Sequence, residues 1–150
     1  MIRAATEADA EALVNIYNYY ITNTVITFEE LPVTAEAFAG RIRHILEDGY
    51  PYLVAEEDGE ILGYAYASQF RTRVAYRFTT ETTVYLKHGV SGKGLGTALL
   101  HLLLLRLVSC LTPSVFILPS TILHKQNSGN LFFDSRSLLL IYHSADVNNY

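Results

Sequence analysis

The stretch that decides the fold is Ser91-Gly92-Lys93-Gly94-Leu95-Gly96-Thr97-Ala98-Leu99-Leu100. It follows Thr79–Leu86, which is rich in threonine, valine and tyrosine and therefore predicts a β-strand. A helix is expected from about Leu95 to Val108. Glycines between a strand and a helix let the backbone approach a ligand and turn its N–H groups toward it, and the helix start adds a partial positive charge. The pattern is typical of a pyrophosphate cradle; the alternative is a glycine-rich turn that only starts a helix.

Two nucleotide-binding motifs do not fit this loop. A P-loop reads G-x-x-x-x-G-K-[ST], but here position 87 is lysine and position 94 is glycine. A Rossmann fingerprint reads G-x-G-x-x-G after the first strand of a βαβ unit, whereas this loop reads G-x-G-x-G. The glycines therefore favour a phosphate-binding loop of another kind.

The first part of the chain predicts a strand and a helix. A short strand over Ile2–Ala5 is followed by Thr6, which can cap a helix together with Asp9 three residues later. Apolar residues recur at helical spacing and give this helix one buried face. They are Leu13, Ile16, Tyr17 and Tyr20.

A second helix and a hairpin follow. Thr34 is expected to cap the helix and Gly49 to end it. Its expected buried face consists of Phe38, Ile42, Ile45 and Leu46. Tyr52–Glu56 and Ile61–Ser68 predict two strands, and Asp58-Gly59 between them is a strong signal for a tight hairpin turn. The order of elements predicts one mixed α/β (α+β) domain over residues 1–150.

Composition narrows the class of protein. Half of the 150 residues are hydrophobic and 17% are charged, which is typical of a globular domain. The net charge of -4 and the lack of a Lys/Arg block argue against a nucleic-acid partner. Cys110 is the only cysteine, which fits a reducing compartment, and the five histidines lack metal-ligand spacing. The apolar stretch Ala98–Leu111 is interrupted by His101 and Arg106, so we expect a cytoplasmic protein with no membrane segment and no metal.

The loop resembles the acetyl-CoA motif of the GCN5-related N-acetyltransferase (GNAT) superfamily, Q/R-x-x-G-x-G/A. Gly94 and Gly96 match the motif, and Ser91 departs from the usual Gln or Arg. Further segments resemble the phosphinothricin acetyltransferase branch, over about residues 1–106. They are Ile16-Tyr17-Asn18, Thr24 through Phe28-Glu29, Tyr52 through Glu56, Gly63-Tyr64-Ala65, Arg73 through Arg77, Thr80-Glu81 and Val84-Tyr85.

The resemblance implies a GNAT-like fold, with a mostly antiparallel central sheet flanked by helices, and acetyl-CoA as cosubstrate. It places the general base at Glu81, for which the alternative is a solvated glutamate on an edge strand. The backbone of the preceding strand is expected to hold the pantetheine arm and polarise the thioester oxygen. The residues implied in coenzyme binding are Val84, Tyr85, Leu86, Ser91, Gly92, Lys93, Gly94, Leu95, Gly96 and Thr97.

The acceptor is implied to be the amine of a small amino acid or amino-acid analogue. A basic, aromatic cluster before the catalytic strand suits the carboxylate or phosphinate of such a molecule. Its members are Arg71, Arg73, Tyr76 and Arg77, and Phe28 is a further expected contact. The alternative for any single arginine is a surface position on a loop. Tyr17, Tyr19 and Tyr20 are expected to divide between the core and the acceptor pocket, with Tyr17 in the core.

The chain changes character near Arg106. Residues 107–150 hold two of the 15 acidic residues but seven serines, and the expected family pattern of strand, turn and helix is not evident there. A change of reading frame or an alternative ending is our hypothesis for this segment. Val115–Leu118 is expected to form a strand beside Thr79–Leu86, Leu138–Tyr142 is a second candidate strand, and residues 127–150 are expected to pack poorly and to add no catalytic group.

Two classes of function follow. The first is an active N-acetyltransferase for a small amino acid analogue, commonly a homodimer in this branch. The second is a non-catalytic protein of the acetyltransferase fold that at most binds coenzyme A. The tyrosine that often protonates the departing thiolate is not identified, and Tyr142 is a guess for it.

Overall fold

A computed structural model of the chain describes residues 1–27, 29–70, 79–90, 92–110 and 116–119. Each strand and helix predicted before residue 120 is present, with slightly shifted ends. In chain order the elements are β1 (Ile2–Ala4), a 3-10 helix (Glu7–Asp9), α1 (Ala10–Asn23), α2 (Ala35–Glu47), β2 (Tyr52–Glu57), β3 (Glu60–Gln69), β4 (Thr79–Leu86), α3 (Leu95–Cys110) and β5 (Phe116–Pro119).

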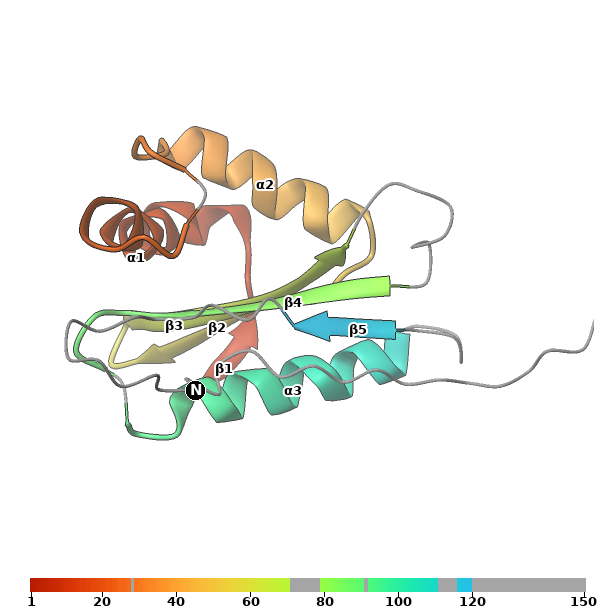
Figure 1. Cartoon of the computed structure of the whole chain (residues 1–150). Helices are drawn as coiled ribbons and strands as arrows, with labels where there is room; N and C mark the ends of the chain where they lie inside the picture. The colour runs from red at the N-terminus through yellow and green to blue at the C-terminus, as the bar shows by residue number, and fades with distance from the viewer. Residues whose placement is uncertain (28, 71–78, 91, 111–115, 120–150) are drawn as a thin grey trace, which may run out of the picture.

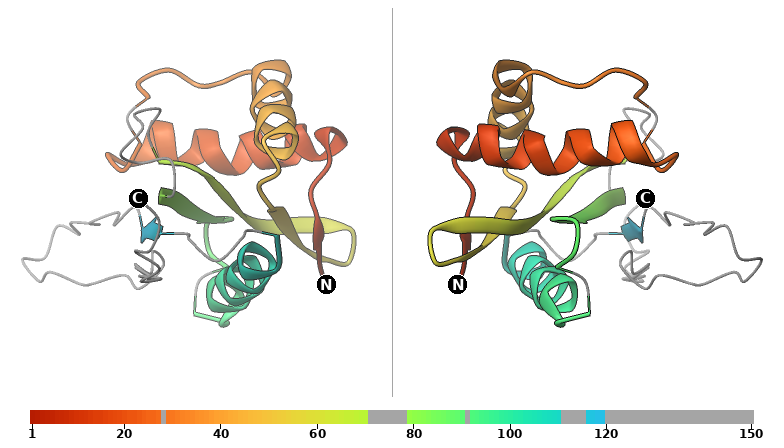
Figure 2. Two further views of the ribbon diagram at one scale, coloured as in Figure 1. Left: turned by 90° about the vertical axis from the view of Figure 1, so that its right-hand side faces the viewer. Right: turned by 90° about the vertical axis from the view of Figure 1, so that its left-hand side faces the viewer.

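The described strands form one sheet in the order β1-β2-β3-β4-β5. The first four run antiparallel to their neighbours, and β5 runs parallel to β4. Helices α1 and α2 cover one face and α3 covers the other (Figure 1). Figure 2 shows α1 crossing above the sheet from the β1 side toward the β5 side. The predicted class, a mixed α/β fold with a mostly antiparallel central sheet, is confirmed.

Side chains along each strand alternate between two hydrophobic layers. The layer under α1 and α2 centres on Tyr64, which is fully buried; the ring centroids of Tyr52 and Tyr66 lie 5.8 and 6.4 Å from that of Tyr64. The layer against α3 combines small residues of β3, such as Ala65 and Ala67, with leucines of the helix. These leucines are Leu99, Leu100, Leu103 and Leu107.

Local sequence signals explain the turns and caps. Asp58 and Gly59 have φ angles of 51° and 79°, as a two-residue hairpin turn requires. The Thr34 hydroxyl accepts a hydrogen bond of 3.2 Å from the Ala37 N–H and caps α2 as predicted. Gly63 is needed for close packing, because an added Cβ would lie 2.5 Å from Leu86 Cδ2.

One predicted core residue is wrong. Leu46 is 38% exposed, whereas Phe38 and Ile42 are buried and Ile45 packs against them at the edge of the core. Leu46 follows Ile45 by one position, which turns its side chain about 100° around the helix axis, away from the sheet.

The predicted pairing of the last described strand with β4 is confirmed, because Phe116–Pro119 pairs with Thr79–Thr82. Residues 127–150, including the candidate strand Leu138–Tyr142, lie outside the described residues. Within the described ranges, no helix has the length and apolar character needed to cross a membrane.

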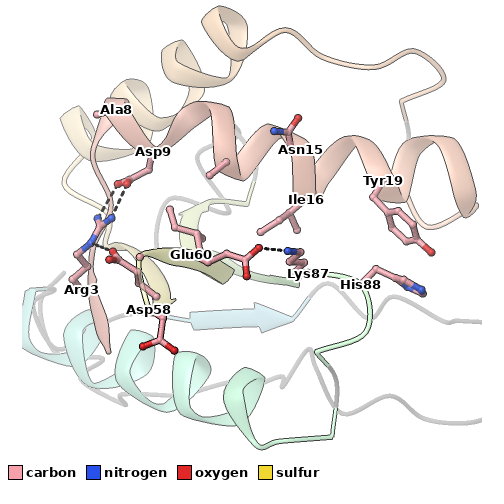
Figure 3. A pocket seen from close by; sticks show the side chains of 14 residues that line it. Arg3, Ala8, Asp9, Asn15, Ile16, Tyr19, Asp58, Glu60, Lys87 and His88 are labelled. Carbon is pink, nitrogen blue, oxygen red and sulfur yellow. Dashed lines mark hydrogen bonds and ion pairs between the residues drawn. The ribbon is translucent and has the colours of Figure 1, made fainter.

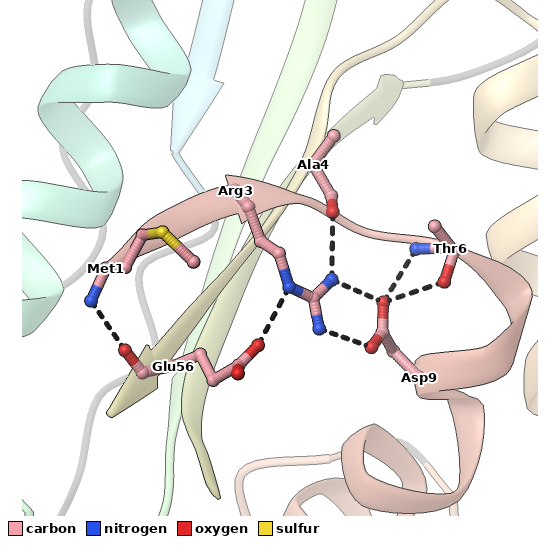
Figure 4. Close-up of polar contacts among 6 residues, drawn as sticks. All are labelled: Met1, Arg3, Ala4, Thr6, Asp9 and Glu56. Atoms are coloured by element: carbon pink, nitrogen blue, oxygen red, sulfur yellow. Dashed lines mark hydrogen bonds and ion pairs between the residues drawn. The ribbon is translucent and has the colours of Figure 1, made fainter. Parts of the chain in front are cut away.

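Arg3 links the start of the chain to the sheet and to the start of α1 (Figure 4). Its guanidinium donates to both carboxylate oxygens of Asp9, at 2.9 and 2.7 Å, and to Glu56 at 2.8 Å. Asp9 also accepts from the Thr6 N–H at 2.8 Å, which is one half of the predicted capping box. The hydrogen bond from Arg3 is the main cause that holds the pKa of the Asp9 carboxyl below its ordinary value; burial opposes it and Thr6 adds to it.

We expect Asp9 to make stability depend on pH. Because its folded-state pKa is depressed, its contribution is fully present above the ordinary value of 3.8 and is lost as the pH falls below it. Urea unfolding of the wild type between pH 3 and 7 should show a loss of unfolding free energy at the acidic end that is smaller in Asp9→Asn. The control is Glu11→Gln, an exposed carboxylate of α1. An unchanged acid-dependent loss in Asp9→Asn would contradict the assignment.

We expect α3 to hold the lower layer through its buried leucines. Leu103 is 0% exposed and Leu105 is 66% exposed on the same helix. Leu103→Ala should lower the unfolding free energy by about 2–5 kcal/mol, because it leaves a cavity. Leu105→Ala should change it by less than about 0.5 kcal/mol. Equal losses of unfolding free energy in the two variants, measured by urea unfolding, would contradict the assignment of Leu103 to the buried face of α3 and of Leu105 to its exposed face.

Candidate functional site

Strand β4 is paired along its whole length on one side but only in part on the other. All of Gly63–Gln69 pairs with Leu86–Thr80 across β3 and β4. On the other side β5 pairs with Thr79–Thr82 alone, and among the described residues no strand continues this pairing along Thr83–Leu86 (Figure 1). An unpaired strand edge presents backbone N–H and C=O groups that need partners. The second half of β4 is therefore a candidate binding edge.

The direction of the backbone groups along β4 follows from the pairing with β3. The N–H of Lys87 donates to Leu62 O at 2.8 Å, and the C=O of Thr79 accepts from Phe70 at 3.1 Å, so the odd-numbered residues point toward β3. Because backbone groups alternate sides along a strand, those of Val84 and Leu86 point toward the open edge.

Of the three β4 residues predicted to bind the coenzyme, Val84 and Leu86 present backbone groups at this edge, and Tyr85 does not. The Tyr85 backbone faces β3, and its ring lies in the layer under α1, 5.3 Å from the ring of Tyr17. The Tyr20 hydroxyl donates a hydrogen bond of 2.6 Å to the Leu86 C=O. This bond ties the C-terminal part of α1 to the end of β4, where the glycine loop begins.

The glycine loop after β4 has the backbone conformation that its sequence predicts. Gly89, Gly92 and Gly94 have φ angles of 84°, 91° and 75°, which side-chain-bearing residues rarely adopt. An added Cβ at Gly94 would meet no atom within 4 Å, so this position faces open space. The Gly94 C=O accepts from the Ala98 N–H at 3.0 Å and opens α3. The loop therefore leads from the open strand edge into the positive end of a helix.

Glu81 lies at the middle of β4 and is the one residue of this strand that is not buried. It pairs in register with Ser68 of β3 and Leu118 of β5, beside the point where β4 and β5 part. As an odd-numbered residue it shares with Tyr85 the sheet face that lies under α1 and α2. The Glu81 side chain is thus on the face of the sheet opposite α3, close to the open edge.

A second carboxylate lies on the same face of the sheet. Glu29, in the connection between α1 and α2, accepts a hydrogen bond of 2.6 Å from Arg41. The Arg41 guanidinium carbon lies 5.8 Å from the ring centroid of Tyr17 and 6.0 Å from that of Phe38. The other Glu29 oxygen, Oε2, is buried and accepts no hydrogen bond from the described residues.

The connection that carries Glu29 is fixed at both ends. The Asn18 side chain pairs with the Val33 backbone through two hydrogen bonds, of 2.9 Å to the C=O and 2.8 Å from the N–H. The Thr24 hydroxyl and N–H both donate to Tyr20 O, at 2.5 and 3.1 Å. Glu29 is therefore held by anchored chain on either side.

The pKa of the Tyr66 hydroxyl reflects both carboxylates. Burial is the main cause that raises it, a hydrogen bond with Thr83 opposes the rise, and the charge of Glu81 adds to it. Arg41 then lowers this pKa and Glu29 raises it.

A separate hollow lies between α1 and the end of the β2–β3 hairpin (Figure 3). Most of its charged groups form ion pairs: Arg3 bonds Asp9 and Glu56, and Lys87 bonds Glu60. At its far end the rings of Tyr19 and His88 stack with centroids 4.5 Å apart. Because both cations of this hollow are already paired, it is a less suitable site for the phosphates of a coenzyme than the glycine loop. Among the described residues no cluster of His, Cys, Asp or Glu is arranged to hold a metal ion.

The structure places the glycine loop directly after the open edge of β4. The Glu81 side chain lies on the face of the sheet opposite α3. Predicted acceptor contacts lie outside the described residues, as does Ser91 of the loop. These acceptor contacts are Phe28, Arg71, Arg73, Tyr76 and Arg77. Tyr17 packs against the core as predicted.

The sequence prediction missed the Glu29–Arg41 pair and the bond from Tyr20 to Leu86. The helical spacing of Phe38 and Arg41 places them on neighbouring positions of α2, but this spacing does not reveal a partner twelve residues earlier. The Tyr20–Leu86 bond joins residues 66 positions apart, so no local pattern could show it.

Comparison with known proteins gives a consistent result. Residues 2–131 match the family model described as acetyltransferase (GNAT) domain, which continues past residue 106, the expected end of the resemblance. The chain is 41% identical over 105 residues to phosphinothricin N-acetyltransferase of Alcaligenes faecalis, covering 70% of this chain and 53% of that protein. It is 36% identical over 105 residues to L-methionine sulfoximine/L-methionine sulfone acetyltransferase of Salmonella typhimurium, covering 69% and 60%. The chain thus spans little more than half the length of these relatives.

Solved structures show the same likeness. A GNAT superfamily phosphinothricin acetyltransferase from Sinorhizobium meliloti, in complex with AcCoA, superposes with a TM-score of 0.69 at 43% identity, covering 73% of this chain and 60% of that one. A ribosomal-protein-alanine N-acetyltransferase from Brucella melitensis gives a TM-score of 0.72 at 35% identity, covering 78% and 71%.

Proposed function

This chain belongs to the GNAT acetyltransferase family, and on that premise we propose that it transfers the acetyl group of acetyl-CoA to the amine of a small amino acid or amino-acid analogue. The observation that carries the proposal is the incomplete pairing of β4, whose open half runs directly into the glycine loop. The names of the relatives, which concern phosphinothricin and methionine sulfoximine, support the class of acceptor.

The open edge suits the extended, amide-containing arm of coenzyme A. Val84 offers both its N–H and its C=O there, and Leu86 offers its N–H, because Tyr20 already bonds the Leu86 C=O. Two amides of an extended ligand can pair with such groups as another strand would. The open edge therefore fits the arm that ends in the thioester.

The loop and the start of α3 suit the pyrophosphate. Positive φ angles at Gly92 and Gly94 turn the backbone as an anion cradle requires, and the first N–H groups of α3 have no acceptor within the helix. The proposed contacts are Ser91, Gly92, Lys93, Gly94, Leu95, Gly96 and Thr97.

Acetyl-CoA supplies an acetyl group activated as a thioester. The protein must then remove a proton from the acceptor's ammonium group, so that the neutral amine can attack the thioester. It must also stabilise the negative charge that develops on the acyl oxygen. We assign proton removal to Glu81, on the sheet face under α1 and α2, and charge stabilisation to the outward N–H of Val84. Phe28, Arg71, Arg73 and Tyr76 remain the proposed acceptor contacts. The proposal includes a cytoplasmic homodimer and requires no metal, nucleic acid or membrane.

Replacing Glu81 should separate turnover from coenzyme binding. Glu81→Gln should lower the turnover number by about 10²-fold or more, the usual scale of general-base loss, with little change in affinity for acetyl-CoA. The measurement is acetyl-CoA-dependent thiol release over a panel of amino acids, as a function of pH, and the acidic limb of the pH–rate profile should disappear. Glu57→Gln, an exposed carboxylate at the end of β2, is the control. Full turnover by Glu81→Gln would exclude Glu81 as the base, and wild-type binding without thiol release would favour the non-catalytic alternative.

Replacing Gly94 should abolish coenzyme binding. At a φ of 75°, a valine is strained, and its side chain would fill the open space proposed for the phosphate. Calorimetric titration of Gly94→Val with acetyl-CoA should give no measurable binding. Gly40→Val is the matched control, because Gly40 is exposed on α2 with no atom within 4 Å of an added Cβ. Wild-type affinity in Gly94→Val would place the coenzyme elsewhere.

A further inference from the structure

The Tyr20 hydroxyl lies at the open edge of β4. The peptide bond between Leu86 and Lys87 is trans, so its C=O and its N–H point in opposite directions. The Lys87 N–H donates to Leu62 O of β3 at 2.8 Å, and the Leu86 C=O therefore points away from β3. The Tyr20 hydroxyl donates to this C=O at 2.6 Å. A side chain of α1 thus reaches the strand edge to which we assign the arm of the coenzyme.

Aromatic packing fixes the Tyr20 ring in this position. Its centroid lies 5.7 Å from that of Tyr19 and 5.3 Å from that of Tyr85. Tyr19 in turn stacks on His88, which follows β4, with centroids 4.5 Å apart (Figure 3). The Tyr20 side chain is half-buried. Because the ring is held by its neighbours, a phenylalanine at this position should keep the ring in place and lose the hydroxyl alone.

The hydroxyl of Tyr20 stands where a paired ligand would place a donor. A strand that pairs with the Leu86 C=O brings an N–H nitrogen to about 2.9 Å from its oxygen, and the Tyr20 oxygen already lies at 2.6 Å. A phenol has one proton to donate and two lone pairs that accept. Since the proton is used on Leu86, Tyr20 meets a ligand as an acceptor, and two lone pairs allow this even where another group of the protein also contacts the oxygen.

The order of groups along the edge matches the order along the coenzyme. From the middle of β4 toward the glycine loop, the edge presents the N–H of Val84, its C=O, the N–H of Leu86 and then the Tyr20 oxygen. From the thioester toward the pyrophosphate, acetyl-CoA presents its acyl oxygen, an amide N–H, the C=O of that amide and a second amide N–H. With the acyl oxygen at the Val84 N–H, as proposed above, the second amide N–H falls opposite Tyr20.

The same order separates Tyr20 from the reacting atoms. Leu86 lies two residues beyond Val84, which is about 7 Å along a strand. The Tyr20 hydroxyl, at the Leu86 C=O, is therefore displaced toward the loop from the place proposed for the thioester. Its position fits a contact with the arm and not proton donation to the departing thiolate.

We propose that the Tyr20 hydroxyl, in place of the Leu86 C=O, accepts a hydrogen bond from the second amide N–H of acetyl-CoA. The inference rests on the proposed function and adds to it a coenzyme-binding residue from α1. The competing explanation is that Tyr20 only fastens α1 to the end of β4. Loss of a fastening would weaken binding of every form of the coenzyme, whereas loss of an acceptor would weaken only forms that carry this N–H.

The test is calorimetric binding of coenzyme A and of two analogues, in which an ester oxygen replaces the N–H of either the first or the second amide. The proteins are the wild type, Tyr20→Phe and the control Tyr19→Phe, which keeps the ring that stacks on His88. Tyr20→Phe should raise the Kd of coenzyme A and of the first-amide analogue about 5-fold. It should leave the Kd of the second-amide analogue unchanged, and Tyr19→Phe should change none of the three.

An equal rise of Kd for all three ligands in Tyr20→Phe would reduce Tyr20 to a fastening and overturn the inference. An unchanged Kd of coenzyme A would overturn it too, as would insensitivity of the first-amide analogue in place of the second. The expected pattern in a protein that releases no thiol would refute the proposed reaction and leave the Tyr20 contact in place. A wild type that acetylates amino acids while Tyr20→Phe binds all three ligands normally would refute this contact alone.

Discussion

The arrangement of the molecule depends on the incomplete pairing of β4. A strand inside a sheet normally satisfies its backbone on both sides, and β4 does so with β3 over its full length. With β5 it does so only through Thr79–Thr82. The unpaired part of β4, Thr83–Leu86, is held by α1, because the Tyr20 hydroxyl donates a hydrogen bond to the Leu86 C=O. The chain then continues into the glycine loop and α3. The same gap that leaves backbone groups without a strand partner gives an extended ligand its place.

Alternation along this strand separates the tasks of the proposed site. Even-numbered residues such as Val84 and Leu86 send their side chains into the layer against α3, which fixes the loop beneath the sheet. Odd-numbered residues such as Glu81 and Tyr85 face α1 and α2. Coenzyme and acceptor can therefore approach β4 from different sides and meet at its open edge.

The sequence predicts those features that local physics dictates. Asp58-Gly59 forces a tight turn, Thr34 caps α2, and glycines between β4 and α3 permit the positive φ angles that the structure has. The prediction that Leu46 is buried is wrong, because a shift of one position along a helix turns a side chain by about 100° and so takes it off the buried face. Contacts between distant segments leave no periodic signal, which is why Glu29–Arg41 and Tyr20–Leu86 emerge only from the folded chain.

The proposed acceptor site offers a zwitterionic amino acid two kinds of charged group, a carboxylate for its amine end and arginines for its carboxylate end. Glu81 is the carboxylate proposed for the amine end, as the base that removes its proton. The carboxylate end then needs its own cation, and Arg71 and Arg73 are the residues proposed for it. An amine without a carboxylate would leave these arginines without their partner, whereas an acid without an amine would offer no nitrogen to accept the acetyl group. Since each unmet buried partner weakens binding, such a site selects molecules that carry both groups at the spacing of an amino acid.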